Sequence, residues 1–164
     1  MKTIIGRKNK IEIQIDEEDY IRLSNDKWSF SLTEHGYIFC NKYIGKIEGK
    51  YKYERKYLHA LIVGTPKGLF TDHVNGDRLD NRKENLRICT AYQNSLNKKG
   101  YNNVTSKYKG VYKHTQYNRW VSQIKYKGTV YSLGCFKTPE EAALTYNEKA
   151  KELHGEYARL NIIK

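Results

Sequence analysis

Apolar and polar residues alternate over residues 11–15, which read Ile-Glu-Ile-Gln-Ile. This alternation predicts a half-buried strand. The acid-rich run at 16–23 predicts one or two helical turns with acids at their positive end. Residues 27–32 and 37–43 flank a Glu-His-Gly segment and predict a hairpin. The first 50 or so residues are therefore expected to form a β-rich module.

The next pattern begins with an apolar helical run at 57–63, which ends at Gly64 and is followed by Pro66 as a stop. A short strand then leads into an Asp-His pair at 72–73. The following residues contain an Asn-Gly turn at 75–76 and are mostly polar through Glu84. The pattern predicts a strand that opens into a turn-rich loop.

A second strand is predicted after this loop, because Leu86, Ile88 and Thr90 alternate as one face. Thr90 can cap a helix that begins near Ala91. Asn94 then lies in the first turn of that helix or just beyond it.

Residues 98–106 are polar, contain Gly and Asn and have no clear period, which predicts a linker. Three strand patterns follow at 110–114, 120–126 and 129–136. Thr138-Pro139-Glu140-Glu141 is typical of a helix start. The apolar face of this helix comprises Ala142, Ala143, Tyr146, Ala150 and Leu153.

The predicted fold class is therefore α+β, with a β-rich N-terminal segment, a strand–strand–helix motif and a three-stranded antiparallel sheet packed on one helix. The expected organisation is an N-terminal domain at 1–97, whose motif occupies about 68–97, a linker at 98–106 and a second domain at 107–164. Strand residues Val121, Ile124 and Phe136, together with Trp120 and Leu133, are expected in the core of the second domain.

The charge of the chain favours a polyanionic partner: 30 basic residues face 18 acidic ones, for a net charge of +12. From residue 85 to residue 139 there is no Asp or Glu, while Lys, Arg and Tyr interleave. A solvated surface normally mixes both signs, so this stretch predicts a surface for nucleic-acid phosphates. Among its cations are Arg87, Lys98, Lys99, Lys107, Lys109, Lys113, Arg119 and Lys125.

The three cysteines, Cys40, Cys89 and Cys135, are far apart and form no Cys-x-x-Cys pair. We therefore expect neither a structural zinc site nor a disulfide framework, and we predict each cysteine to be a small buried side chain. No apolar run approaches the roughly 20 residues of a membrane span, and the N-terminus lacks the apolar segment of a signal peptide. The sequence predicts a cytoplasmic protein.

Residues 59–94 resemble HNH nucleases, specifically the ββα-metal group of phage intron-encoded homing endonucleases. The resemblance rests on the Asp-His pair at 72–73, the Asn-Leu-Arg at 85–87 and the asparagine of the following helix. It implies that Asp72 and Asn94 bind one divalent cation, Mg²⁺ with Mn²⁺ as a substitute. It also implies that His73 is the general base and that Asn85 ties the loop and holds the His73 ring.

The physical chemistry of these residue types agrees with the implied roles. An imidazole with a pKa near 6.5 can deprotonate a water at neutral pH. A hard cation with oxygen ligands can stabilise the departing 3′ oxygen, and Mg²⁺ needs few protein ligands. His59 is interpreted as a packed structural histidine outside the site. Arg87 is left with two interpretations, a phosphate contact or the polar side of its strand.

Residues 107–161 resemble the AP2 DNA-binding domain, through Lys-Gly-Val, Leu-Gly-x-Phe, Glu-Glu-Ala-Ala, Tyr-Asn and a terminal Leu-Asn in that order. The resemblance implies that the sheet enters the major groove of DNA. Where plant AP2 domains use several arginines and tryptophans, this chain has Tyr112, His114, Gln123 and Ser132, so a GC-rich target is not expected. The resemblance and the acid-free stretch together give the predicted DNA-binding residues, which are Lys98, Lys99, Lys107, Lys109, Tyr112, Lys113, His114, Arg119, Gln123 and Lys125.

Together these features predict a site-specific DNA endonuclease that acts on double-stranded DNA as a monomer without an obligatory protein partner, and the family resemblance implies that it is a homing endonuclease. One alternative is a sequence-specific DNA-binding protein or transcriptional regulator with an inactive HNH motif. Asp72, His73 and Asn94 are all retained, which argues against a motif that has lost its catalytic residues. A third interpretation is an RNA-binding protein whose tyrosines stack on unpaired bases.

Overall fold

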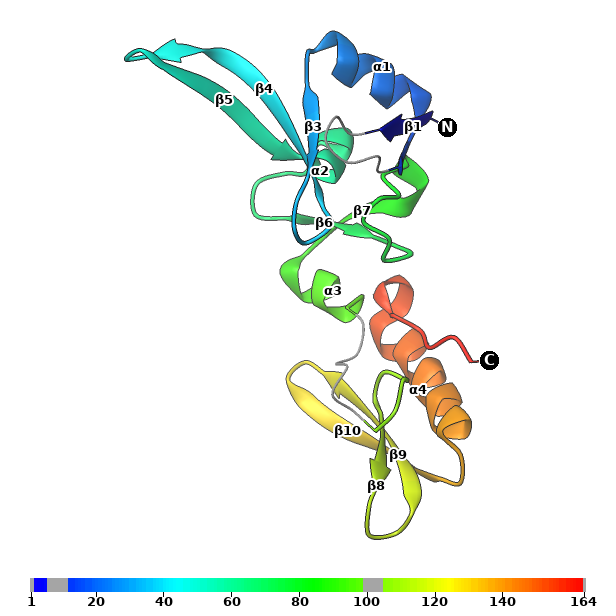
Figure 1. Cartoon of the computed structure of the whole chain (residues 1–164). Helices are drawn as coiled ribbons and strands as arrows, with labels where there is room; N and C mark the ends of the chain where they lie inside the picture. Colours follow the sequence, from blue (N-terminus) through cyan, green and yellow to red (C-terminus); the bar gives the residue numbers. More distant parts are fainter. Residues whose placement is uncertain (1, 6–11, 99–104, 164) are drawn as a thin grey trace. The chain divides into compact units, whose positions relative to one another are not determined.

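The computed structural model describes residues 2–5, 12–98 and 105–163 and divides into two compact units, Met1–Asn94 and Ser95–Lys164. We describe each unit by itself (Figure 1). Both units contain antiparallel sheets and helices, so the predicted α+β class is confirmed. Most of the predicted linker, residues 99–104, lies outside the described residues.

The first unit begins with strand β1 (Lys2–Ile5), which pairs antiparallel with β2 (Glu12–Ile15). Residue 11 of the predicted strand lies outside the described residues. Helix α1 (Glu17–Asn25) follows and has acids in its first turn, as predicted. Ile13 and Ile15 of β2 pack with Leu23 of α1 in the core of this unit.

The predicted hairpin is present as β3 (Ser29–Leu32) and β4 (Ile38–Ile47), but a third strand, β5 (Lys50–Tyr57), adds to it in the order β3-β4-β5. Strand β5 carries no pattern of apolar alternation, because its side chains are cations, tyrosines and one acid that are almost all exposed. Glu48 and Gly49 join β4 to β5, with φ of 50° and 76°, as a tight hairpin turn requires.

The motif region follows as α2 (Leu58–Val63), β6 (Phe70–His73), a 3-10 turn at Lys83–Asn85, β7 (Leu86–Cys89) and α3 (Ala91–Leu96). Strands β6 and β7 pair antiparallel. Gly64 ends α2 in the left-handed conformation, as predicted.

The predicted face of β7 needs correction. Leu86 is buried, but Ile88 is 38% exposed, and the second buried side chain of the strand is Cys89. The strand ends at Cys89, so Thr90 does not continue its face. Its hydroxyl instead accepts a hydrogen bond from the backbone amide of Gln93 at 3.2 Å, which confirms the predicted helix cap.

The second unit contains strands β8 (Val111–His114), β9 (Arg119–Tyr126) and β10 (Thr129–Phe136) in the order β10-β9-β8, followed by α4 (Pro139–His154) and a 3-10 turn at Gly155–Tyr157. Helix α4 packs on one face of this sheet (Figure 1). It begins with a capping box between Thr138 and Glu141. The strands and the helix lie where the sequence predicts them.

The ends of this second unit are joined by the asparagine of the terminal Leu-Asn. The side chain of Asn161 accepts a hydrogen bond from the backbone amide of Lys109 at 2.6 Å and donates one to its carbonyl at 3.0 Å. Gly110 then passes against the ring of Tyr146, where an added Cβ would lie 2.2 Å from a ring carbon. The Lys-Gly-Val segment therefore requires glycine for close packing on α4.

One cysteine departs from the prediction. Cys40 and Cys89 are buried, as expected, but Cys135 is exposed. It lies opposite Val121 in the sheet, on the face that α4 does not cover. Within the described parts of the chain, no helix is long and apolar enough to cross a membrane.

Candidate active site

Strand β6 ends in the Asp-His pair, and its cross-strand partners on β7 are Arg87 for Asp72 and Leu86 for His73. Asp72 is only 7% exposed. The Arg87 guanidinium donates to one of its carboxylate oxygens, Oδ2, from Nη2 at 2.8 Å and from Nε at 3.1 Å. Neither interpretation of Arg87 included this contact. In the structure the Arg87 side chain binds the carboxylate of Asp72.

The ring of His73 is buried, and its Nε2 lies 3.3 Å from the side-chain oxygen of Asn81. Asn81 is 1% exposed, and its own Nδ2 donates to the backbone carbonyl of Arg78 at 3.1 Å. This second hydrogen bond fixes the orientation of the Asn81 amide, so its oxygen faces His73. Nε2 must then carry the proton, and Nδ1 is left as the basic nitrogen.

Burial lowers the pKa of His73 below its usual value of 6.5. The hydrogen bond that His73 donates to Asn81 and the charges of Asp72, Asp77 and Asp80 oppose this effect but do not cancel it. The imidazole is therefore mainly neutral at pH 7, which is the form that a general base requires.

Asn85 ties the two ends of the polar loop together. Its Nδ2 donates to the carbonyl of Asp80 at 2.7 Å, and its Oδ1 accepts from the backbone amide of Asn75 at 3.0 Å. This geometry fits the loop-tying part of the role implied by the resemblance. The hydrogen bond to the His73 ring, however, comes from Asn81, which the sequence analysis did not select.

The loop that holds Asn81 is braced internally by an ion pair. The guanidinium of Arg82 binds both carboxylate oxygens of Asp80, at 2.8 and 2.7 Å, and lowers the pKa of that acid. Asn75 donates to the same carboxylate at 2.9 Å. These contacts brace the loop from within.

The N-terminal strand holds the same loop from outside. The backbone of Gln14 in β2 accepts from the amide of Asn81 at 2.8 Å and donates to the carbonyl of Leu79 at 2.9 Å. The Asp16 side chain accepts from the amide of Lys83 at 2.8 Å. The β-rich segment is therefore part of the scaffold that positions His73.

His59 is buried in α2, as predicted, but its ring centroid lies 5.1 Å from that of His73, edge to face. Tyr57 stacks on its other side at 5.2 Å. Burial, with a smaller contribution from His73, lowers the pKa of His59 to about 4. Sequence reasoning missed this proximity, because His59 and His73 lie on different elements and no short motif joins them.

We expect acid to destabilise the fold through His59. Above pH 6.5 the side chain is neutral in both the folded and the unfolded chain, so its contribution is complete. As the pH falls from 6.5 towards 4, only the unfolded chain binds the proton, and about 3 kcal/mol of stability is lost. Thermal melting of the His59→Phe variant between pH 7.5 and 5 should show a weaker acid sensitivity than the natural chain. Replacing the exposed His35 with Ala is the control, and an unchanged pH dependence in His59→Phe would contradict the assignment.

The donor atoms at the end of β6 and in α3 suit a hard cation. Asp72 offers a carboxylate, and Asn94, the fourth residue of α3 and half-buried, offers an amide oxygen. Oxygen ligands of this kind match Mg²⁺ and similar ions. Burial, with a smaller contribution from the charge of Asp72, raises the pKa of Cys89 at the end of β7. By the chemistry of their side chains, Asp72 and Asn94 suit a divalent metal, and their joint role as its ligands stays a prediction.

The predicted DNA-binding residues of the second unit fall into two sets. Directly opposed residues on antiparallel strands share a face. Pairing therefore places one set together on the face of the sheet that α4 leaves open, namely Tyr112, His114, Arg119, Gln123 and Lys125.

The remaining predicted residues lie elsewhere. Lys113 pairs with Trp120 on the other face, with its ammonium 5.9 Å from the Trp120 ring centroid. The ammonium of Lys109 donates to the carbonyls of Leu96 and Lys98, at 2.6 and 2.8 Å. Lys98 and Lys107 are exposed, and Lys99 lies outside the described residues.

Comparison with known proteins identifies the family. Residues 57–96 match the family model of the HNH endonucleases. An HNH endonuclease of Acanthamoeba polyphaga mimivirus is 33% identical over 144 residues, which cover 86% of this chain and 74% of that protein. The chain belongs to the HNH endonuclease family. The prediction of a nuclease is thereby confirmed at the level of the family.

Further relatives of this HNH protein cover parts of the chain. A Bacillus subtilis (strain 168) protein, named as a prophage-derived HNH homing endonuclease, is 33% identical over 70 residues, 40% of this chain and 38% of that one. Dehydration-responsive element-binding protein 2E of Oryza sativa subsp. japonica is 43% identical over 67 residues, 40% of this chain and 21% of that one. The resemblance to an HNH nuclease with an AP2-type domain is confirmed. No solved structure gives a significant match.

Proposed function

We propose that this HNH protein is a site-specific DNA endonuclease of the homing type, which hydrolyses one phosphodiester bond with one divalent cation and His73 as general base. The observation that carries the proposal is the arrangement at the end of β6. There a buried neutral imidazole, held at Nε2 by Asn81, lies beside a buried carboxylate. This pairing of a base with an anionic ligand is what metal-assisted hydrolysis of a phosphodiester requires.

In the proposed reaction Nδ1 of His73 takes a proton from the attacking water, and the Asn81 hydrogen bond keeps the ring oriented during the transfer. Asp72 and Asn94 would hold the cation, which supplies charge stabilisation at the scissile phosphate and the departing oxygen. Arg87 holds one oxygen of Asp72, so it fixes the direction of the carboxylate. Asn85 keeps the loop between β6 and β7 closed.

The open face of the second-unit sheet is proposed to place the cut on duplex DNA. Its Arg119 and Lys125 are exposed, and a sheet can enter the major groove. The relative from Oryza sativa is named as a dehydration-responsive element-binding protein, which supports a binding role for this unit. The substitutions at the contact positions argue for a target other than a GC-rich plant element.

The double variant Arg119→Ala/Lys125→Ala should bind duplex DNA about tenfold more weakly and with a shallower salt dependence, because two phosphate or base contacts are lost. Fluorescence anisotropy at two salt concentrations measures both effects. Lys137→Ala/Lys151→Ala removes the same charge from exposed positions in and next to α4 and should bind nearly as the natural chain does. Equal weakening in both variants would mean that net charge alone, rather than this face, binds DNA.

The proposal itself is tested by incubating the purified chain with phage and host DNA in Mg²⁺ or Mn²⁺ and mapping the ends by sequencing. We expect discrete ends with a 5′ phosphate and a 3′ hydroxyl that require the metal. Tight duplex binding with no cut at any metal concentration would overturn the proposal in favour of a DNA-binding protein with an inactive motif. Preference for single-stranded RNA over duplex DNA would overturn both the endonuclease proposal and the alternative of a DNA-binding protein.

A further inference from the structure

The hairpin of β4 and β5 extends beyond the rest of the first unit. Strand β3 pairs with β4 only as far as Asn41, so residues 42–47 of β4 have β5 as their single neighbour. Figure 1 shows this hairpin as a two-stranded ribbon that projects from the unit. Its outer part exposes large aromatic side chains, since Tyr43, Tyr51 and Tyr53 are 52%, 62% and 59% exposed. A soluble surface does not normally gather such rings without a partner.

Strand register places these rings on one face. Directly opposed residues share a face, and a bulge at residue 44 keeps Lys46 on the same side as Tyr43. We call this surface the hairpin face. Its members are the pairs Phe39 with Tyr57, Asn41 with Arg55, Tyr43 with Tyr53, and Lys46 with Tyr51.

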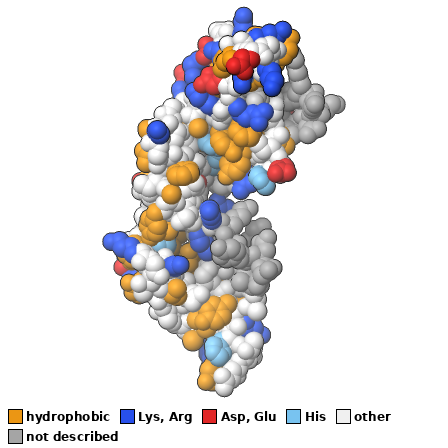
Figure 2. All heavy atoms as spheres, turned by 90° about the vertical axis from the view of Figure 1, so that its left-hand side faces the viewer, with side chains coloured by type: hydrophobic (Ala, Val, Ile, Leu, Met, Phe, Trp, Pro, Cys, Tyr) orange, Lys and Arg blue, Asp and Glu red, His pale blue; other side chains and the backbone are white. Residues whose placement is uncertain are grey.

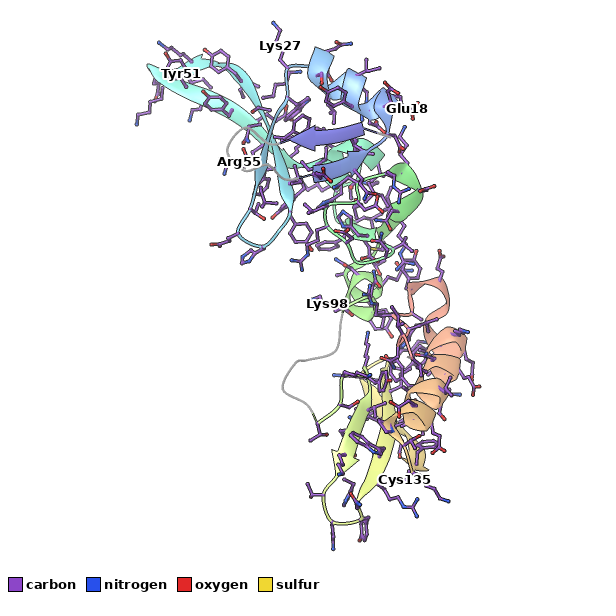
Figure 3. The ribbon with its side chains drawn as sticks, turned by 45° about the vertical axis from the view of Figure 1, so that its right-hand side comes forward. Glu18, Lys27, Tyr51, Arg55, Lys98 and Cys135 are labelled. Carbon is purple, nitrogen blue, oxygen red and sulfur yellow. The ribbon has the colours of Figure 1, made fainter. Side chains whose placement is uncertain are left out.

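Contacts between neighbours join the hairpin face into one stripe. Tyr43 packs at an angle against Tyr51 and Tyr53, with centroids 6.0 and 5.7 Å apart. The ammonium of Lys46 lies 4.6 Å from the centroid of the Tyr51 ring. At the base of the hairpin, Arg55 lies over the Phe39 ring at 5.5 Å. Figure 3 shows Tyr51 near the tip of the ribbon and Arg55 nearer its base.

The charge of the hairpin face is positive and is not neutralised on that face. Its cations are Lys46 and Arg55. Glu54 lies on the opposite face, where it pairs with Lys56 at 2.7 Å, and Glu48 lies in the turn. Figure 2, in which the hairpin points towards the viewer at the top, shows Lys and Arg side chains beside hydrophobic ones there. The surface therefore suits a polyanion.

The hairpin face continues into the active site. Phe39 stacks on Tyr57 at 4.3 Å, Tyr57 stacks on His59 at 5.2 Å, and His59 meets His73 at 5.1 Å. An unbroken row of rings thus leads from the catalytic histidine to the hairpin. From Tyr57 to Tyr51 the strand spans about 20 Å at roughly 3.3 Å per residue. That length matches about six base pairs of duplex DNA at 3.4 Å each.

We propose that the hairpin face binds the duplex DNA that flanks the cut on one side, as a second DNA-binding surface separate from the AP2-type sheet; the inference rests on the proposed function. The cations and tyrosine hydroxyls donate to backbone phosphates, and a two-stranded ribbon has the width of the major groove. Unpaired bases fit less well. Tyr43 packs against Tyr51 and Tyr53, and Lys46 lies over Tyr51, so each ring already has a neighbour on part of its surface and offers less area for stacking on bases.

The test uses the full chain, a fluorescein-labelled 30-base-pair duplex of mixed sequence and a chelator, so that binding is measured without cleavage. The variant Lys46→Gln/Tyr51→Ser/Tyr53→Ser should bind about tenfold more weakly. Lys50→Gln/Lys52→Gln removes more charge, but from the opposite face, and should bind within about twofold of the natural chain. Tyr51→Phe/Tyr53→Phe keeps both rings, protects the fold and should still bind about threefold more weakly.

Equal affinity of the hairpin-face variants and the natural chain overturns the inference, as does an equal loss in the opposite-face variant. A single-stranded 30-mer that displaces the duplex from the natural chain, but not from the hairpin-face variant, also overturns it. Failure of the proposed function gives a different pattern: the natural chain binds through the hairpin face but cuts no DNA in Mg²⁺ or Mn²⁺. Hydroxyl-radical footprints should show protection of about six base pairs that is lost with the hairpin-face variant.

Discussion

His73→Ala is expected to reduce the rate of DNA cleavage at least about a thousandfold, while DNA affinity stays nearly unchanged. The imidazole is buried, and in the proposed mechanism it takes a proton from the reacting water through Nδ1, so it should contribute to the transition state more than to binding. Single-turnover cleavage of a mapped substrate measures the rate, and anisotropy with a chelator measures the affinity. The variant should also lose the decline in rate that protonation of His73 causes below pH 6.5 in the natural chain.

His35→Ala is the matched control, because the side chain of His35 is exposed in the same unit and the substitution leaves its backbone carbonyl, which accepts from Arg78, in place. It should cleave at the natural rate. A His73→Ala variant that still cuts normally, with correct folding by circular dichroism, would remove the general-base role. A variant that fails to bind DNA would instead assign His73 to substrate binding.

The parts of the fold that the sequence predicted are those with a local signal. Alternating isoleucines marked β2, Thr138 and Pro139 marked the start of α4, and Thr90 marked the cap of α3. Strand β5 had no such signal, because it is held by pairing with β4 while its side chains stay in solvent. A strand without a buried face cannot be recognised from hydrophobic alternation.

In the candidate site, too, residues with a local sequence signal were predicted, whereas contacts that depend on tertiary structure were not. Adjacent residues Asp72 and His73 were predicted from a short motif, but their partners depend on tertiary structure. Asn81 reaches His73 only because β2 holds the loop through Gln14. Arg87 reaches Asp72 because the register of β6 and β7 sets the two side by side. Neither of these two contacts can be inferred from the spacing of the residues along the chain.

Asp72→Asn should reduce metal-dependent cleavage about a thousandfold, because loss of a carboxylate ligand removes several kcal/mol of metal-based stabilisation. The substitution keeps the shape of the side chain, so the loop and the ring of His73 should stay in place. It also leaves the guanidinium of Arg87 without its anion, 2.8 Å from the former carboxylate position. DNA affinity in chelator should therefore be kept or raised, since one negative charge near the phosphate is gone.

Asp77→Asn is the matched control, with the same change of charge in the same loop. Asp77 is exposed, and its side chain accepts a hydrogen bond from the amide of Leu79 at 3.0 Å, which an asparagine oxygen can also accept. The metal concentration for half-maximal cleavage should rise sharply for Asp72→Asn and stay constant for Asp77→Asn. Because the charge lost is the same in both variants, a difference between them isolates ligation from general electrostatics. If Asp72→Asn cut DNA with the natural metal requirement, the cation would have to be held elsewhere, and the paired roles of Asp72 and Asn94 would fall together.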